Sequence, residues 1–294
     1  MNDRHIFYKG MLLVFFAAVL FGTTGTSQAL APEGISPSLI GVLRLIIGGP
    51  SLLLLLVVTG RFNPLKFRGP ILPILIAACG IIMFQFCFFE AVSRTGVALG
   101  TIIAICMGPV IAGLLGAVFQ KEKLTIAWVI SSILAISGCI ILTGPGDDIT
   151  VDRAGVILAA GAGFGYAVSL VASKAAFGDR SPVICIAIIL CTGALLVLPR
   201  LLFEDMTQLM TPRGLAVVLY LGTVATAGAY LLLAKGLALI PVSSTAVIML
   251  AEPLTGCLLG VLLLGEIFTM TSAGGAMLIF CGLIIVATDK TDTT

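Results

Sequence analysis

The sequence predicts an all-α polytopic membrane protein with ten transmembrane helices, arranged as a 5+5 inverted-topology repeat. Three observations predict this fold: an apolar composition, ten long apolar runs and an internal repeat. The 294 residues are 59% hydrophobic and only 10% charged, with a mean hydropathy of +1.20. Soluble domains usually contain about 25% charged residues. The composition therefore indicates an integral membrane protein that lies in a lipid bilayer.

The same composition excludes several classes of site. A net charge of +2 leaves no basic surface for nucleic acid. The eight cysteines all lie in apolar runs without CxxC spacing, and His5 is the single histidine. Neither a Ser-His-Asp nor a Cys-His arrangement is available, and no phosphate-binding P-loop is present. We therefore expect no metal, no cofactor, no enzyme activity and no primary pumping by this chain alone.

The apolar runs are each about 20 residues long, which is enough for a helix to cross a bilayer. They are continuously apolar, whereas a membrane strand would alternate. The first run is interpreted as a helix and not as a signal peptide, because it extends past a typical apolar core. The runs cover residues 10–30, 36–59, 70–91, 96–119 and 125–143 and, after the polar insert GPGDDITVD, 154–177, 182–203, 214–236, 241–265 and 270–288.

Basic residues in the short connections predict the orientation of the chain. With the N-terminus inside, the inner segments hold eleven Lys and Arg, and the outer segments hold four. Basic residues in short loops stay on the cytoplasmic side. We therefore expect both termini to be cytoplasmic.

The chain repeats itself after 144 residues. In this register residues 108–122 lie over residues 252–266, so that Pro109 falls on Pro253 and Glu122 on Glu266. We expect a first repeat at 1–144, a linker at 145–153 and a second repeat at 154–294. Because each copy has five spans, an odd number, the second copy enters the membrane inverted. Inverted repeats are typical of secondary transporters whose site lies at the bilayer midplane between the copies.

These residues carry a family resemblance. The ten spans, the repeat, Arg44 within GVLRLIIGG and the paired blocks ending in QKE and LGE resemble the drug/metabolite transporter superfamily, EamA type. The resemblance covers nearly the whole chain, and the Glu-Pro of AEPL is among its most specific elements. It implies a bacterial inner-membrane carrier, often an amino-acid exporter, with a central cavity. Trp128 is the single tryptophan, so the chain departs from relatives with an aromatic box.

Glu252 is the first candidate for the transport pathway. It stands near the middle of its span, where a charge is costly and is therefore usually functional or paired. Pro253 cannot donate a backbone hydrogen bond, so a local kink is expected there. The carboxyl could carry a proton or bind a substrate amine, or it could only hold helices together. Pro109 and Pro253 are the candidate hinges.

Arg44 is the complementary candidate, about 12 Å along its span at 1.5 Å per residue. It could bind a substrate carboxylate, pair with Glu252 or extend outward along its own aliphatic stem.

Uncharged polar residues recur on single helical faces and complete the predicted site. One stripe is Tyr166, Ser169 and Ser173, another is Thr223, Thr226 and Tyr230, and a third runs through Thr245 and Met249 to Glu252. Hydroxyls that bond to their own helix are the alternative for each Ser and Thr. The predicted substrate-binding set is Thr24, Arg44, Gln85, Tyr166, Ser169, Thr226, Tyr230, Thr245 and Glu252.

The remaining charges are interpreted as structural. Lys174 and Lys235 are expected to extend to the membrane surface, and Glu90 is expected to pair with Arg94 four residues later. A gating role is the alternative for these charges. Glu122 and Glu266, at equivalent helix ends, are interpreted as capping or hinge charges.

The expected function is alternating-access export or exchange of a small polar metabolite such as an amino acid across the inner membrane. The partners are then the substrate and the lipid bilayer, with protons as a candidate coupling ion, in a monomer or a weak homodimer. A membrane-embedded enzyme acting on lipid-linked substrates is one alternative, for which only Asp147 and Asp148 offer paired carboxylates in a loop. A passive channel is another.

Overall fold

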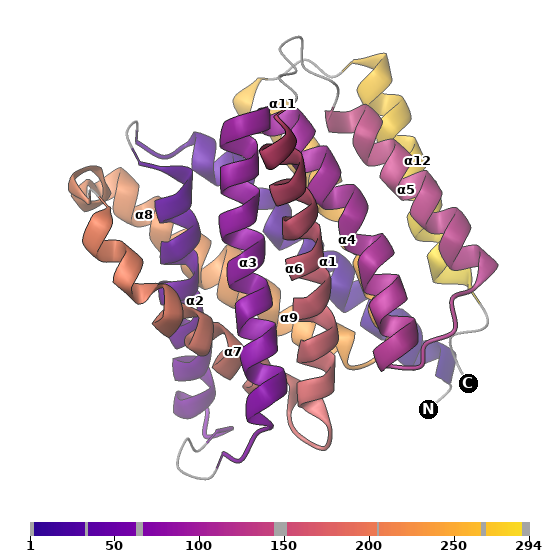
Figure 1. Cartoon of the computed structure of the whole chain (residues 1–294), viewed down its shortest axis with the longest axis horizontal. Coiled ribbons are helices and arrows are strands. Elements are labelled where there is room, and N and C mark those ends of the chain that lie inside the picture. The colour runs from indigo at the N-terminus through magenta and orange to yellow at the C-terminus, as the bar shows by residue number, and fades with distance from the viewer. Residues whose placement is uncertain are drawn as a thin grey trace.

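The computed structural model describes residues 3–32, 35–62, 67–143, 152–204, 206–265 and 269–289, which form helices and loops without any strand (Figure 1). The predicted all-α polytopic fold is confirmed. The first five helices are α1 (Asp3–Ala29), α2 (Pro37–Val58), α3 (Ile71–Thr95), α4 (Val97–Phe119) and α5 (Ile126–Thr143). The later ones are α6 (Arg153–Phe177), α7 (Pro182–Val197), α8 (Pro212–Gly222), α9 (Ala229–Leu237), α10 (Val242–Ile248), α11 (Ala251–Leu264) and α12 (Met270–Thr288), with 3-10 helices η2 (Leu198–Phe203) and η3 (Thr207–Met210) and the π-helix η4 (Thr223–Gly228).

Within the described ranges, nine helical segments are long and apolar enough to cross a membrane. Three of these spans are composite, because Pro182–Phe203 joins α7 and η2, Pro212–Leu237 joins α8, η4 and α9, and Val242–Leu264 joins α10 and α11. The remaining apolar helix, Ile126–Leu142, is shorter and lies at the lower limit of spanning length, about 17 residues. Each of the ten apolar runs of the sequence thus corresponds to a helical segment.

The outer surface of the bundle is apolar, as a lipid environment requires. Ile71, Val118, Ile157 and Met277 are between 68% and 74% exposed, although each is a large hydrophobic residue. In water such surfaces would drive aggregation or association. Their position on spanning helices therefore fits contact with lipid.

Side-chain oxygen atoms mark several helix starts. An N-cap oxygen accepts a hydrogen bond from a backbone N–H that has no partner within the helix. Five described helices begin in this way: Ser36 Oγ accepts from Leu39 N at 3.1 Å, Thr125 Oγ1 from Trp128 N at 3.0 Å, Asp152 Oδ1 from Ala154 N at 2.8 Å, Thr211 Oγ1 from Gly214 N at 3.1 Å and Thr269 Oγ1 from Ser272 N at 3.1 Å.

The two halves of the chain are interleaved in one bundle. From the second half, α6 packs against α3 and α4, while α1 packs against α9 and α11; α2 also packs against α7, and α5 against α12. Figure 1 shows α5 and α12 side by side at one edge and α2 and α8 at the opposite edge, and the start of α1 lies near the end of α12. Every one of these contacts joins a helix before residue 144 to a helix after residue 152. The central helices therefore belong to both halves.

The crossing of α3 and α6 depends on two glycines. A Cβ atom on Gly80 would lie 2.7 Å from the carbonyl oxygen of Gly165, and one on Gly165 would lie 2.8 Å from the carbonyl oxygen of Gly80. Small residues allow backbones to approach this closely in membrane proteins. Gly165 thus serves packing within the monomer.

Two irregular segments interrupt the second half. The residues 223–228 form a π-helix between α8 and α9, and the chain leaves helical bonding at Met249 and Leu250, between α10 and α11. The π-helix changes the angular spacing of residues, so the predicted stripe of Thr223, Thr226 and Tyr230 is wrong for its first member. Thr223 is exposed, and its hydroxyl donates to Leu219 O of its own helix at 2.6 Å.

Candidate functional site

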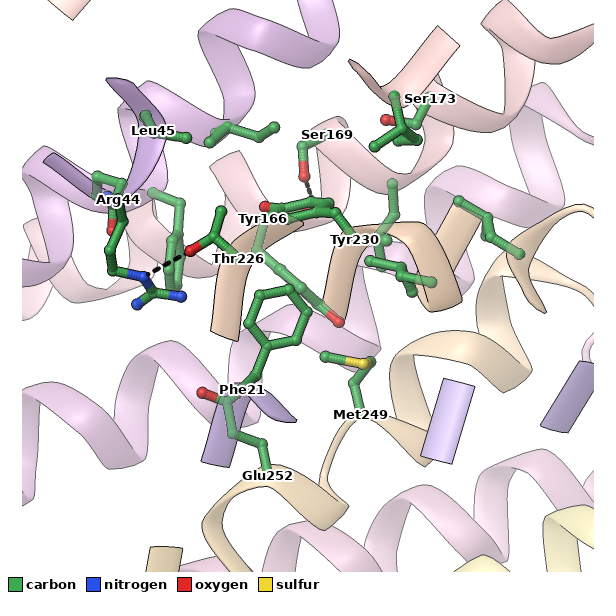
Figure 2. Close-up of a pocket in the computed structure, with 17 residues that line it drawn as sticks. Phe21, Arg44, Leu45, Tyr166, Ser169, Ser173, Thr226, Tyr230, Met249 and Glu252 are labelled. Atoms are coloured by element: carbon green, nitrogen blue, oxygen red, sulfur yellow. Dashed lines mark hydrogen bonds between the residues drawn. The ribbon is translucent and has the colours of Figure 1, made fainter. Parts of the chain in front are cut away.

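A cavity of about 100 Å³ lies among helices of both halves (Figure 2). Its lining combines two charged side chains with hydroxyl, amide and aromatic groups. The polar members are Arg44, Gln85, Tyr166, Ser169, Ser173, Thr226, Tyr230 and Glu252, and the apolar members are Phe21, Leu45, Ile81, Phe84, Leu170, Ile186, Leu233, Leu237 and Met249.

The structure brings seven of the nine predicted binding residues to this cavity and leaves Thr24 and Thr245 outside its lining. Thr245 is buried, and its hydroxyl donates to Pro241 O at 2.8 Å, one turn back in the chain. The buried hydroxyl of Thr24 has no hydrogen-bond partner among the described residues. Ser173 lines the cavity but is not in the predicted binding set, although the sequence places it on the same stripe as Tyr166. Met249 was on the stripe that ends at Glu252, and the other apolar members carry no sequence signal that separates them from core residues.

Arg44 reaches the cavity from α2 and is held by the second half of the chain. Its Nε donates a hydrogen bond to Thr226 Oγ1 at 3.1 Å. Thr226 is buried within the π-helix η4, so the irregular backbone places the acceptor of this bond. Because a guanidinium has five N–H donors, further donors remain for a planar anion such as a carboxylate.

Glu252 enters the cavity from the first turn of α11, immediately after the break in the helix. Its side chain is exposed at the cavity. Among the described residues, no hydrogen bond or ion pair joins its carboxyl to another side chain, and no ion pair of 4.0 Å or less joins it to Arg44. Pairing with Glu252, one of the three alternatives considered for Arg44, is therefore absent from the described residues of this structure.

The polar groups of the cavity still lie within electrostatic range of one another. Arg44, Tyr230 and Glu252 all line this one cavity. Figure 2 shows Arg44 and Glu252 on separate sides of the drawn site, with aromatic side chains in the region between their labels. Two opposite charges that face one space without direct contact can bind the two ends of a zwitterion.

Three further polar side chains line the cavity, Gln85 from α3 and Tyr166 and Ser169 from α6. Gln85 Nε2 donates to Gly41 O at 2.7 Å, which holds the amide between α3 and α2. The hydroxyl of Tyr166 is buried and has no hydrogen-bond partner among the described residues. Ser169 Oγ donates to Tyr166 O at 2.7 Å, so its hydroxyl proton serves its own helix. Tyr166 therefore offers an unused polar group, whereas Gln85 and Ser169 are already engaged.

Three predictions about charged residues outside the cavity can be compared with the structure. Arg94 pairs with Glu90 at 2.8 Å, as predicted. Lys174 does not extend to the membrane surface: its Nζ donates to Glu122 Oε1 at 3.3 Å and to Ile240 O at 2.7 Å. The ammonium stays inside the protein because the Glu122 carboxylate and the Ile240 carbonyl lie within hydrogen-bonding distance of it. Glu122 caps a helix, as predicted, but the helix is α10 and not its own.

Three predicted features fall outside the described residues, namely Glu266 and the aspartates Asp147 and Asp148 of the linker. Within the described residues, no cluster of three His, Cys, Asp or Glu side chains could hold a metal ion.

Comparison with known proteins places this architecture in a family. Residues 8–144 and 153–288 each match the EamA-like transporter family. The chain is 39% identical over 276 residues to the uncharacterized transporter YwfM of Bacillus subtilis, covering 94% of this chain and 93% of that protein. It is 24% identical to the uncharacterized inner membrane transporter YicL of Salmonella typhimurium, with 96% of each chain covered.

A solved crystal structure has the same fold, with a TM-score of 0.82 at 22% identity, covering 95% of this chain and 98% of the other. The family matches together cover almost the whole chain, and both sequence relatives are named as transporters. The chain is therefore a multi-pass membrane transporter that belongs to the EamA-like family of the drug/metabolite transporter superfamily.

Proposed function

We propose that this transporter exports or exchanges small zwitterionic metabolites, such as amino acids, across the bacterial inner membrane. One observation carries the proposal: Arg44 from the first half and Glu252 from the second face the same cavity without forming an ion pair. A guanidinium binds a carboxylate through parallel hydrogen bonds, and a carboxylate binds an ammonium group. The two residues thus match the two ends of an amino acid.

The size of the cavity supports a small substrate. Its volume is about 100 Å³, whereas sites for drug-sized ligands occupy roughly 300 to 1,000 Å³. An amino acid of modest size suits such a space better than a large aromatic cation. Phe21 packs edge-on against Tyr230 with ring centroids 5.1 Å apart, so these rings fill part of the site.

The repeat supports alternating access as the mechanism. Two five-helix copies, one inverted with respect to the other, can rock about a site that both contribute to. The interleaved packing of the halves around the cavity fits this motion. The excess of basic residues in the inner connections favours cytoplasmic termini, and the relative YicL is named as an inner membrane protein.

The test is transport by the purified protein in liposomes loaded with a panel of amino acids. Glu252→Gln is expected to lower the uptake of amino acids about tenfold or more, because the amine loses a charged partner. The same variant should have a much smaller effect on an analogue that lacks the amine. Glu90→Gln is the matched control, since Glu90 lies in an exposed ion pair outside the cavity.

Equal uptake by the Glu252→Gln variant and the unmodified protein, for every substrate of the panel, would refute the assignment. A flux that rises without saturation and shows no counter-exchange would indicate a channel instead. Turnover of lipid-linked substrates by the same liposomes would indicate an enzyme.

A further inference from the structure

A second polar cluster lies at the end of the bundle where the chain termini lie. Glu122, just after α4, extends its carboxyl to the start of α10 on the other half of the chain. Its Oε1 accepts from Val242 N at 2.6 Å, and its Oε2 accepts from Ser243 N at 3.0 Å and from Ser243 Oγ at 2.9 Å. The two backbone N–H groups lie in the first turn of α10, where a helix offers them no partner of its own. One carboxyl therefore satisfies three donors of the opposite half.

Lys174 of α6 completes this cluster, which we call the termini-side lock: Glu122, Lys174 and the backbone of Ile240, Val242 and Ser243. The Lys174 ammonium bridges Glu122 and the Ile240 carbonyl. The side chains of Glu122 and Lys174 are 8% and 23% exposed, against 51% and 45% for Glu90 and Arg94. Breaking a sheltered ion pair costs more than breaking an exposed one, because an unpaired charge is left behind.

The backbone before Glu122 directs its carboxyl toward the start of α10. Lys121 has φ of +57°, and it is the one described residue other than glycine with a positive φ. A side chain is unfavourable in that conformation. Gly116 makes room for the carboxyl, because a Cβ atom there would lie 2.7 Å from Glu122 Oε2. This conformation ends α4 in a left-handed turn, in which Glu122 N donates to Gly116 O at 3.2 Å.

The termini-side lock is adjacent to the cavity. Ser173, which lines the cavity, precedes Lys174 on α6, and Leu237, which also lines it, is three residues before Ile240. Two more side chains tie the same end together: Gln120 Nε2 donates to Val171 O at 3.2 Å, and Trp128 Nε1 donates to Ser243 O at 3.2 Å. These bonds join the end of α4 and the start of α5 to α6 and α10.

We propose that the termini-side lock is the gate that closes this end of the cavity, and that it opens by loss of the Glu122 bonds to α10 and Lys174. The proposal rests on the alternating-access function proposed above. In this structure the gate is closed. Opening transfers Glu122 and Lys174 to water, which compensates in part for the lost contacts.

The experiment measures access and needs no substrate. Ser173→Cys serves as the reporter in a protein whose native cysteines have been replaced, and a membrane-impermeant maleimide is added to either side of oriented vesicles. Glu122→Gln keeps the side-chain shape but removes the charge. It is expected to raise the labelling rate from the termini side about tenfold and to leave the rate from the other side unchanged. Glu90→Gln is the control and should change neither rate.

Three results would overturn the gate: an unchanged rate from the termini side, an equal rise from both sides, or the same rise in Glu90→Gln. Lys174→Met gives an independent measurement if Glu122→Gln fails to fold, because it removes the ion pair and leaves the cap on α10 intact. It is expected to raise the termini-side rate by a smaller factor, and no rise would equally overturn the proposal. If labelling changes as expected but the protein does not transport amino acids, the proposed substrate class is wrong and the proposed gate stands.

Discussion

Two spans that the repeat makes equivalent differ in backbone. In the register of 144 residues α4 corresponds to α10 and α11, and Pro109 corresponds to Pro253. The helix α4 continues from Val97 to Phe119 through Pro109, whereas its counterpart is interrupted at Met249 and Leu250. A proline at the same place thus breaks one copy and not the other.

The two spans differ in the residue that precedes the proline. Gly108 precedes Pro109 and lies against the ring of Tyr166, where a Cβ atom would be 3.1 Å from Cδ1. Glu252 precedes Pro253, and its backbone N–H donates to Met249 O at 3.0 Å, the carbonyl that a residue with an N–H at 253 would bond. Membrane proteins tolerate irregular backbone where it lines a cavity, and both Met249 and Glu252 line one.

The neighbouring pair of spans follows the same rule. Helix α3 is continuous from Ile71 to Thr95, whereas its counterpart contains the π-helix η4. In the repeat register Thr226 of η4 corresponds to Ile82. Both irregular segments therefore lie in the second copy, at the residues that contact Arg44 or carry the acid. The two copies share a scaffold, and the irregular backbone of the second copy places Thr226 and Glu252 at a cavity that Arg44 and Gln85 of the first copy also line.

The largest expected effect tests the break itself. Pro253→Ala restores a donor for Met249 O, which should extend the helix through the break and rotate Glu252 away from its present position. Transport is expected to fall about tenfold, a factor that corresponds to about 1.4 kcal/mol. Pro109→Ala, in the continuous copy, should leave transport within about twofold. Equal effects of the two substitutions on liposome uptake would contradict the comparison.

A smaller effect is expected at the π-helix. Thr226→Val keeps the shape of the side chain and removes the acceptor of Arg44 Nε. Loss of a partner of a charged donor costs about 1 to 3 kcal/mol. We expect a lower melting temperature and an apparent KM for amino acids that rises about fivefold. Ile82→Val at the equivalent position of α3 can lower stability through lost packing, but it should not change the KM. A KM change in both variants would show that η4 has no special role.

The fold could be predicted from sequence because its cause is local and repeated. Continuous apolar runs fix the helices, and the polar insert and the match of Pro109 with Pro253 fix the two copies. Chain interleaving could not be predicted in the same way, because it depends on which helical faces meet. Gly165 indicated a close contact, but its partner Gly80 is known only from the structure.

The candidate site was predictable where a helix is regular. Tyr166, Ser169 and Ser173 reach one cavity because α6 keeps its period of 3.6 residues. The stripe through Thr223 failed because η4 changes the period, and Thr245 was separated from Glu252 by the break after α10. Lys174 was misassigned because its partners, Glu122 and Ile240, are 52 and 66 residues away.

The smallest expected effect concerns a hydroxyl that the protein itself does not use. Tyr166→Phe removes a buried hydroxyl without a partner among the described residues. Burial of an unpaired polar group is costly, so its removal should change the free energy of unfolding by less than about 0.5 kcal/mol or stabilise the protein. If the hydroxyl contacts substrate, the apparent KM should nevertheless rise, by about threefold. Melting temperature and liposome uptake measured together separate the two roles: a destabilised variant with an unchanged KM would make Tyr166 a packing residue that shares the wall of the cavity with Arg44 and Glu252.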